Sequence, residues 1–196
     1  HDQSRGGRRM TPILTGRFEE ALIFVAHLHA AQCRKGTKTP YLAHLMAVAS
    51  LVITHGGDED EAIASLLHDA VEDRGGPPTF EMIRARFGER VAAIVDGCTD
   101  TDVVPKPPWQ ERKERYLKRL ASASRSVKLV AAADKLDNVR SIVADHRIHG
   151  PDLWKRFNAG PDDQKWFYRS CMTALHGSPA SIYTELEAAV RQLEQL

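Results

Sequence analysis

Apolar residues recur at helical spacing in almost every segment from position 17 onward. Over residues 17–34 they form one broad stripe, which holds Phe18, Ala21, Leu22, Val25, Ala26 and Leu28. Residues three and four apart lie on one face of a helix, so the stripe predicts an amphipathic helix. No stretch shows the sustained apolar-polar alternation with β-branched residues that is typical of a half-buried strand. The pattern therefore predicts an all-α fold.

Capping and turn residues divide the rest of the chain into short helices. Thr39-Pro40 offers an N-cap followed by proline in the first turn, which predicts a helix over about 40–55. Asp58 and Glu61 have the spacing of a capping box and predict a helix that runs to about residue 72. Further helices are expected over about 79–88, 89–98, 109–121 and 124–146, with two more in the tail after residue 150. Three prolines exclude a helix from residues 100–108, and long irregular segments often carry function.

Composition limits the class of protein. The 196 residues include 27 Lys and Arg against 26 Asp and Glu, a net charge of +1, which argues against a chain that coats nucleic acid or an anionic membrane. No apolar stretch is long enough to span a bilayer, and no secretion-signal pattern opens the sequence. The three cysteines are widely spaced and form neither a zinc-finger pattern nor a disulfide framework. We therefore expect a cytoplasmic protein without a nucleic-acid or membrane partner.

The length is typical of one domain with a sizeable core. Residues 1–12 are basic and lack periodicity, so we interpret them as a flexible arm or an expression remnant. Residues 13–196 are expected to form a single domain, with a core over about 17–147 and a helical tail over 150–196. A homo-oligomer remains open.

Ionisable residues cluster at the end of one apolar helix. His68 and Asp69 end the apolar run 62–67, and Glu72 and Asp73 follow one turn later. On a helix His68 and Glu72 are neighbours at i,i+4, as are Asp69 and Asp73. Buried carboxylates without compensation are costly, so this group requires a cationic partner, and a divalent metal ion is the simplest one.

Two further ionisable residues lie on apolar faces elsewhere. Asp134 shares a helix face with Val130 and Ala131, and His29 lies in the stripe of the first helix. One His, a His-Asp pair and a distant Asp together offer two nitrogen and two carboxylate ligands, a set that suits Mn, Fe or Zn. Each residue alone has an ordinary structural interpretation, such as a core histidine or a salt-bridge partner. Their occurrence together, on three separate helices, favours a metal site.

The order His…His-Asp…Asp resembles that of the HD-domain metal-dependent phosphohydrolases. Longer strings, CRKGTKTPYLAH, LLHDAVEDRG, FGERVAAIVDGCTD and VKLVAAADKLDNVR, resemble the hydrolase domain of RelA/SpoT homologues over about residues 17–147. The tail, with LWKRFNAG and QKWFYRSCMTAL, resembles the single-domain small alarmone hydrolases of the metazoan SpoT-homologue type. This resemblance implies a compact multi-helix HD-domain bundle.

The resemblance also implies an activity. The family removes the 3′-pyrophosphate of guanosine tetra- or pentaphosphate, giving GDP or GTP and pyrophosphate, with one metal ion that is typically Mn²⁺. By motif match the implied metal ligands are His29, His68, Asp69 and Asp134. Glu72 and Asp73 would orient and deprotonate the attacking water, with Glu72 the favoured base.

Further residues are implied to contact or support the nucleotide. Lys106 in the Pro-rich loop would contact phosphate, and Asn138 matches a ribose contact. Arg34 and Lys35, in the turn after the first helix, could reach the nucleotide or could be surface charge. His44 in PYLAH is interpreted as a partner that fixes a metal ligand, with a structural role in the turn as the alternative.

One pair of positions departs from the family pattern. Glu19 and Glu20 stand where a basic pair that stacks on guanine is expected, which leaves Arg17 as the nearby candidate for the base. The same reaction on adenosine 3′-pyrophosphate nucleotides is therefore an alternative. Another HD-type nucleotide phosphohydrolase, such as a nucleoside monophosphate phosphatase, and a nucleotide-sensing module without activity are the others.

Overall fold

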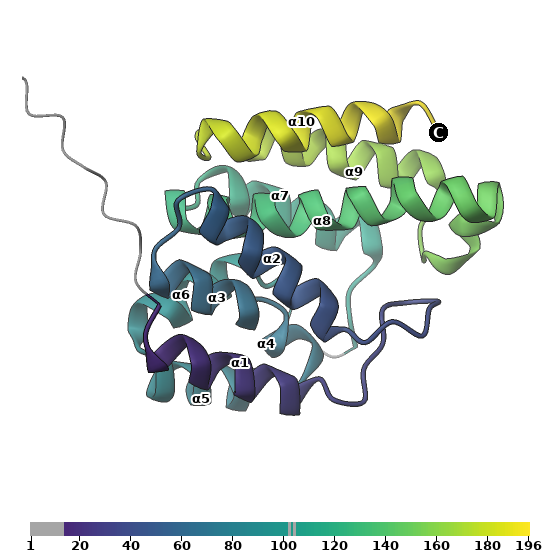
Figure 1. Ribbon diagram of the computed structural model, residues 1–196. Helices are drawn as coiled ribbons and strands as arrows, with labels where there is room; N and C mark the ends of the chain where they lie inside the picture. Colours follow the sequence, from purple (N-terminus) through teal and green to yellow (C-terminus); the bar gives the residue numbers. More distant parts are fainter. Residues whose placement is uncertain (1–13, 102, 104) are drawn as a thin grey trace, which may run out of the picture.

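The computed structural model describes residues 14–101, 103 and 105–196, and this part of the chain folds into helices joined by turns (Figure 1). The elements in order are α1 Gly16–Leu28, α2 Leu42–Thr54, α3 Glu59–Leu67, α4 Ala70–Asp73, α5 Pro77–Phe87, α6 Glu89–Cys98, α7 Trp109–Ala121, α8 Arg125–His149, the 3-10 helix Gly150–Arg156, α9 Pro161–Ala174 and α10 Ala180–Glu194. Within the described residues the only β feature is an isolated bridge between Cys33 and Pro40.

The all-α prediction is confirmed. The expected arm over residues 1–12 lies outside the described residues.

A membrane-crossing helix requires a long apolar stretch, and none of the helices in the described ranges has one.

Helix α8 forms the centre of the molecule. It contacts α2, α3 and α6 on one side and α10 on the other (Figure 1). Its middle section is buried almost completely and holds Leu129, Val130, Ala131, Ala132, Ala133, Asp134 and Leu136. The three alanines leave room for neighbouring helices to approach closely. Asp134 therefore lies at the point where several helices meet.

The N-terminus of α3 is held by the capping box that the sequence predicts. The Asp58 carboxylate accepts a hydrogen bond from the Glu61 amide at 3.0 Å, and the Glu61 carboxylate accepts one from the Asp58 amide at 2.8 Å. The side chain of Glu61 also accepts a hydrogen bond from the Ser126 hydroxyl on α8, at 2.7 Å. This capping box fixes the start of the helix that ends at His68.

Two helix ends differ from the sequence-based expectation. The first helix ends at Leu28 rather than near residue 34, and His29 is its C-cap. The expected continuous helix from Asp58 to about residue 72 is wrong, because α3 ends at Leu67 and a separate turn, α4, follows. The Nδ1–H of His68 donates to the Ser65 carbonyl at 2.7 Å. In a continuing helix that carbonyl would accept from the backbone amide of Asp69, so the side chain competes with the backbone. The break frees His68 and Asp69 to face the same point.

We expect Asp58→Ala to lower the free energy of unfolding by about 1 kcal/mol, the usual cost of removing an N-cap carboxylate. The matched control is Glu187→Ala, which removes an exposed carboxylate paired at i,i+4 with Arg191 and should cost less than about 0.5 kcal/mol. Urea denaturation followed by circular dichroism measures both. Equal losses in the two variants would contradict the capping role.

Candidate active site

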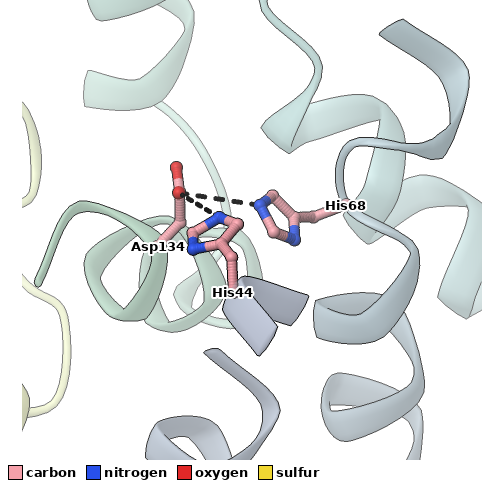
Figure 2. Close-up of side chains that lie close together, drawn as sticks. All are labelled: His44, His68 and Asp134. Carbon is pink, nitrogen blue, oxygen red and sulfur yellow. Dashed lines mark ion pairs between the residues drawn. The ribbon is translucent and has the colours of Figure 1, made fainter. Parts of the chain in front are cut away.

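Three helices bring two imidazoles and a carboxylate together (Figure 2). His44 lies in the first turn of α2, His68 follows the last residue of α3, and Asp134 lies in the middle of α8. One ligand atom from each residue lies within 4.8 Å of the others. Oδ1 of Asp134 is 3.3 Å from Nε2 of His44 and 3.6 Å from Nε2 of His68. All three side chains are buried, with the histidines only 2% exposed.

In its neutral form, each imidazole directs an unprotonated nitrogen at carboxylates. Nδ1 of His68 bonds to the Ser65 carbonyl, and Nδ1 of His44 bonds to Oδ2 of Asp137 at 2.6 Å. A neutral imidazole has a single N–H, so donation through Nδ1 leaves Nε2 with a lone pair. Nε2 of His68 is buried without a hydrogen-bond partner, and Oδ2 of Asp69 lies 3.0 Å away. These lone pairs and carboxylates repel one another unless a cation lies among them.

The pKa values show the same need for positive charge. Burial alone would lower the pKa of His68, but the carboxylates of Asp69 and Asp134 outweigh it and raise that pKa well above 6.5. The pKa of His44 is also raised, because Asp134 and Asp137 outweigh its burial. Burial opposes the shift at Asp134, yet the Lys135 ammonium and the two imidazoles hold its pKa well below its ordinary value. Without a metal ion, the raised pKa values favour protonated imidazoles, and the Lys135 ammonium adds a positive charge next to Asp134.

The donor set is suited to a divalent cation. Imidazole nitrogens and carboxylate oxygens without thiolate are typical ligands of Mn, Fe and Zn in proteins. Two carboxylates, Asp69 and Asp134, balance the charge of one divalent ion. The bond from His44 to Asp137 matches the carboxylate–histidine pairs that orient ligands in metal sites.

The structure places His44, rather than His29, in this cluster. His29 forms a hydrogen bond through Nδ1 to Gln32 at 2.8 Å, and its Nε2 is buried without a hydrogen-bond partner. The ring of Tyr41 contacts both histidines, with ring centroids 5.4 Å from each. His44 was expected only to fix a ligand. The sequence does carry a signal for it, since His44 shares the buried face of α2 with Val48 and Val52 at i+4 and i+8.

A polar cavity of about 200 Å³ opens beside the cluster, and its walls include Asp69, Glu72, Asp73, Asp134, Lys135 and Asn138. Glu72 accepts a hydrogen bond from Lys106 at 2.7 Å, which brings the Pro-rich loop to the site. Burial raises the pKa of Glu72 despite this ion pair, and burial together with Asp69 raises the pKa of Asp73. A raised pKa makes a carboxylate a stronger proton acceptor.

A second cavity, of about 230 Å³, shares Tyr41 and Asn138 with the first. Arg34, Lys35, Phe157 and Tyr168 are among its other lining residues. Cationic and aromatic side chains in one pocket suit the phosphates and the base of a nucleotide. The structure thus places Asn138 against Asp134 of the cluster and Arg34 and Lys35 in the wall of the adjoining cavity.

Arg17 lies outside the two cavities. Its guanidinium pairs with Asp60 at 2.9 Å and donates to the Phe87 carbonyl at 2.9 Å, so it ties α1 to α3 and α5. Glu19 and Glu20 line a separate surface hollow between α1 and α5. The structure brings none of these three residues to the two cavities.

Comparison with known proteins identifies the family. The HD domain model matches residues 21–161. The guanosine-3′,5′-bis(diphosphate) 3′-pyrophosphohydrolase MESH1 of Drosophila melanogaster is 32% identical over 182 residues, which cover 91% of this chain and 95% of the relative. The Xenopus tropicalis MESH1 is 42% identical over 126 residues, which cover 63% and 68%. A solved structure of a metazoan ortholog of SpoT, described as hydrolysing ppGpp, matches 94% of this chain and 99% of its own at 29% identity, with a TM-score of 0.78. The chain belongs to the HD domain family and, within it, to the family of the MESH1 proteins.

The raised histidine pKa values predict how stability depends on pH. A histidine whose pKa rises on folding stabilises the fold fully below its unfolded value, and this contribution is lost as pH rises through the folded pKa. The metal-free chain should therefore lose melting temperature as pH increases above about 6.5, the unfolded value for histidine, and His68→Gln should reduce that slope. Thermal unfolding in chelator over this range measures it. A metal-free melting temperature that increases over the same range would contradict the assignment.

Proposed function

We propose that this chain hydrolyses the 3′-pyrophosphate of guanosine tetra- and pentaphosphate, releasing GDP or GTP and pyrophosphate. The observation that carries this proposal is the buried group of His44, His68 and Asp134 beside two carboxylates of raised pKa, Glu72 and Asp73. The similarity to MESH1 proteins supports it, since it extends over 91% of the chain and includes the tail beyond residue 150.

The proposed cofactor is one divalent metal ion, with Mn²⁺ the favoured species. Its proposed ligands are the Nε2 atoms of His44 and His68 and the carboxylates of Asp69 and Asp134. A bound divalent ion supplies Lewis-acid stabilisation of the negative charge that develops on phosphate oxygens. His29 lies outside this ligand set, because it forms no ion pair with Asp69 or Asp134, whereas Nε2 of His44 lies 3.3 Å from Oδ1 of Asp134.

The nucleotide is proposed to occupy the second cavity, with its 3′-pyrophosphate directed into the polar cavity. Arg34 and Lys35 bring two cations to the wall of the nucleotide cavity, and Asn138 lies where the two cavities meet. Lys106 places its ammonium next to Glu72 and so at the reacting end. This distribution of charge matches a ligand that is anionic at both ends.

Glu72 and Asp73 are the proposed proton acceptors. In this scheme one water attacks the phosphorus bound to the ribose 3′ oxygen, and a carboxylate takes the proton of that water. The bond between this phosphorus and the 3′ oxygen breaks, the 3′ oxygen takes up a proton, and pyrophosphate leaves with the water oxygen. Glu72 is the favoured base, because the Lys106 ammonium and the Asp100 amide hold its side chain in place.

Metal removal and return test this proposal. Dialysis against a chelator should abolish hydrolysis of guanosine tetraphosphate, and addition of Mn²⁺ should restore it, with pyrophosphate as the product. Parallel assays with the adenosine 3′-pyrophosphate analogue and a nucleoside monophosphate compare the alternatives. Release of orthophosphate in place of pyrophosphate would favour a plain phosphatase, and no turnover with any metal would contradict an enzyme.

We expect Glu72→Gln to retain Mn²⁺ and to lose about 100- to 10,000-fold in kcat, the usual contribution of a positioned general base. The control is Glu111→Gln, an exposed glutamate of α7 that pairs with Arg115 and lies outside both cavities. Pyrophosphate release and Mn²⁺ binding are measured for both variants. Unchanged turnover of Glu72→Gln would reject its role as base.

A further inference from the structure

Asp137 bonds to a residue of the histidine cluster and to a residue of the second cavity. It lies on α8, three residues after Asp134, and its side chain is only 18% exposed. One of its oxygens, Oδ2, accepts a hydrogen bond from Nδ1 of His44 at 2.6 Å. The same oxygen accepts one from Nη1 of Arg34 at 2.7 Å. A single carboxylate oxygen thus joins a residue of the histidine cluster to a residue of the nucleotide cavity.

A second set of hydrogen bonds connects Arg34 to the histidine cluster. Nη2 of Arg34 donates to Oδ1 of Asn138 at 3.1 Å, and Nδ2 of Asn138 donates to Oδ1 of Asp134 at 2.6 Å. The Arg34 guanidinium is therefore held by two neighbouring residues of α8, and each of them also bonds to a residue of the histidine cluster. Two bonds to one planar group fix its orientation as well as its place.

The bond to His44 has a direct consequence for metal binding. A carboxylate that accepts from Nδ1 selects the tautomer in which Nε2 is free, and it fixes the plane of the ring. Nε2 of His44 then lies 3.3 Å from Oδ1 of Asp134 and 3.8 Å from Oδ2 of Asp69. Loss of the carboxylate would leave both the tautomer and the ring orientation less defined.

We propose that Asp137 is a positioning residue that couples nucleotide binding to metal binding, because its one oxygen orients His44 toward the metal and holds Arg34 in the nucleotide cavity. The effect of Asp137 on Arg34, which is the nucleotide half of this inference, rests on the proposed function. The effect of Asp137 on His44, which is the metal half, depends only on His44 and is tested without substrate.

The metal half is tested by titrating Mn²⁺ into the metal-free chain and following the electron paramagnetic resonance signal of the free ion. Asp137→Ala should weaken Mn²⁺ binding by about 10- to 100-fold, the usual effect of losing a partner behind a ligand. Asp137→Asn should weaken it less, because its amide oxygen can still accept from His44. Asp145→Asn is the control, since Asp145 pairs with Arg156 in the nucleotide cavity, and its Mn²⁺ affinity should stay within about twofold of wild type.

The nucleotide half is tested by KM in a double-mutant cycle. Arg34→Gln should increase KM for guanosine tetraphosphate and change Mn²⁺ affinity little. Asp137→Ala should increase KM as well, and in the double variant KM should be no higher than with Arg34→Gln alone, because both changes act through one guanidinium. The weaker Mn²⁺ binding should persist in the double variant.

Three results would overturn the proposal. The first is Mn²⁺ affinity within about twofold of wild type in both Asp137 variants, with cooperative melting curves. The second is failure of both variants to fold, which would make Asp137 a purely structural residue. The third is a wild-type chain that binds no Mn²⁺. A wild-type chain that binds Mn²⁺ but releases no pyrophosphate would instead reject the proposed function and leave the link from Asp137 to His44 standing.

Discussion

The arrangement of this site depends on one electrostatic constraint, which is that buried lone pairs and carboxylates require a positive charge among them. His44, His68, Asp69 and Asp134 come from three separate parts of the chain, and their nearest atoms lie 3.0–3.8 Å apart. In a buried setting such groups cannot stay together uncompensated. In the metal-free chain the raised histidine pKa values and the Lys135 ammonium favour compensation by protons and by a cation. A divalent ion would meet the same requirement with a ligand set of matching charge.

The fold supplies the rigid support that this constraint demands. The capping box at Asp58 sets the start of α3, and the break after Leu67 turns His68 and Asp69 toward α8. Small residues around Asp134 allow neighbouring helices to approach it. Acidic side chains, Lys113 and Lys135 are among the residues that line the polar cavity, and Lys106 pairs with Glu72 there. Arg34, Lys35 and Arg156 line the second cavity together with Asp145. Asn138 and Asp137 connect the two regions through α8.

Local rules in the sequence predict most of the fold. Prolines, glycines and capping residues mark the helix ends, and the prediction for 109–121 matches α7 at both ends. The break at His68 escaped prediction because it arises from a side chain that takes a backbone carbonyl, and periodicity carries no information about this bond. The apolar stripe also continued past Leu28, so the end of the first helix was placed too late.

The candidate site was predictable where motif and burial agree. Nε2 of His68 lies close to the carboxylates of Asp69 and Asp134. Asn138 and Lys106 lie beside the polar cavity, and Arg34 and Lys35 line the second one. Two histidines satisfy the first position of the motif order, and the choice between His29 and His44 depends on which one faces α8 in three dimensions. Arg17 was a candidate from its place in the sequence, but acids on α3 hold it. Asp137 gave no signal, because its role requires two partners distant in the sequence.

The most direct test of the central claim is a crystal of the Mn²⁺-loaded chain, with anomalous diffraction measured on both sides of the manganese absorption edge. The account predicts one strong anomalous peak among Nε2 of His44, Nε2 of His68 and the carboxylates of Asp69 and Asp134. A map without a peak there, or with the peak bound to His29 and away from His44, would contradict it.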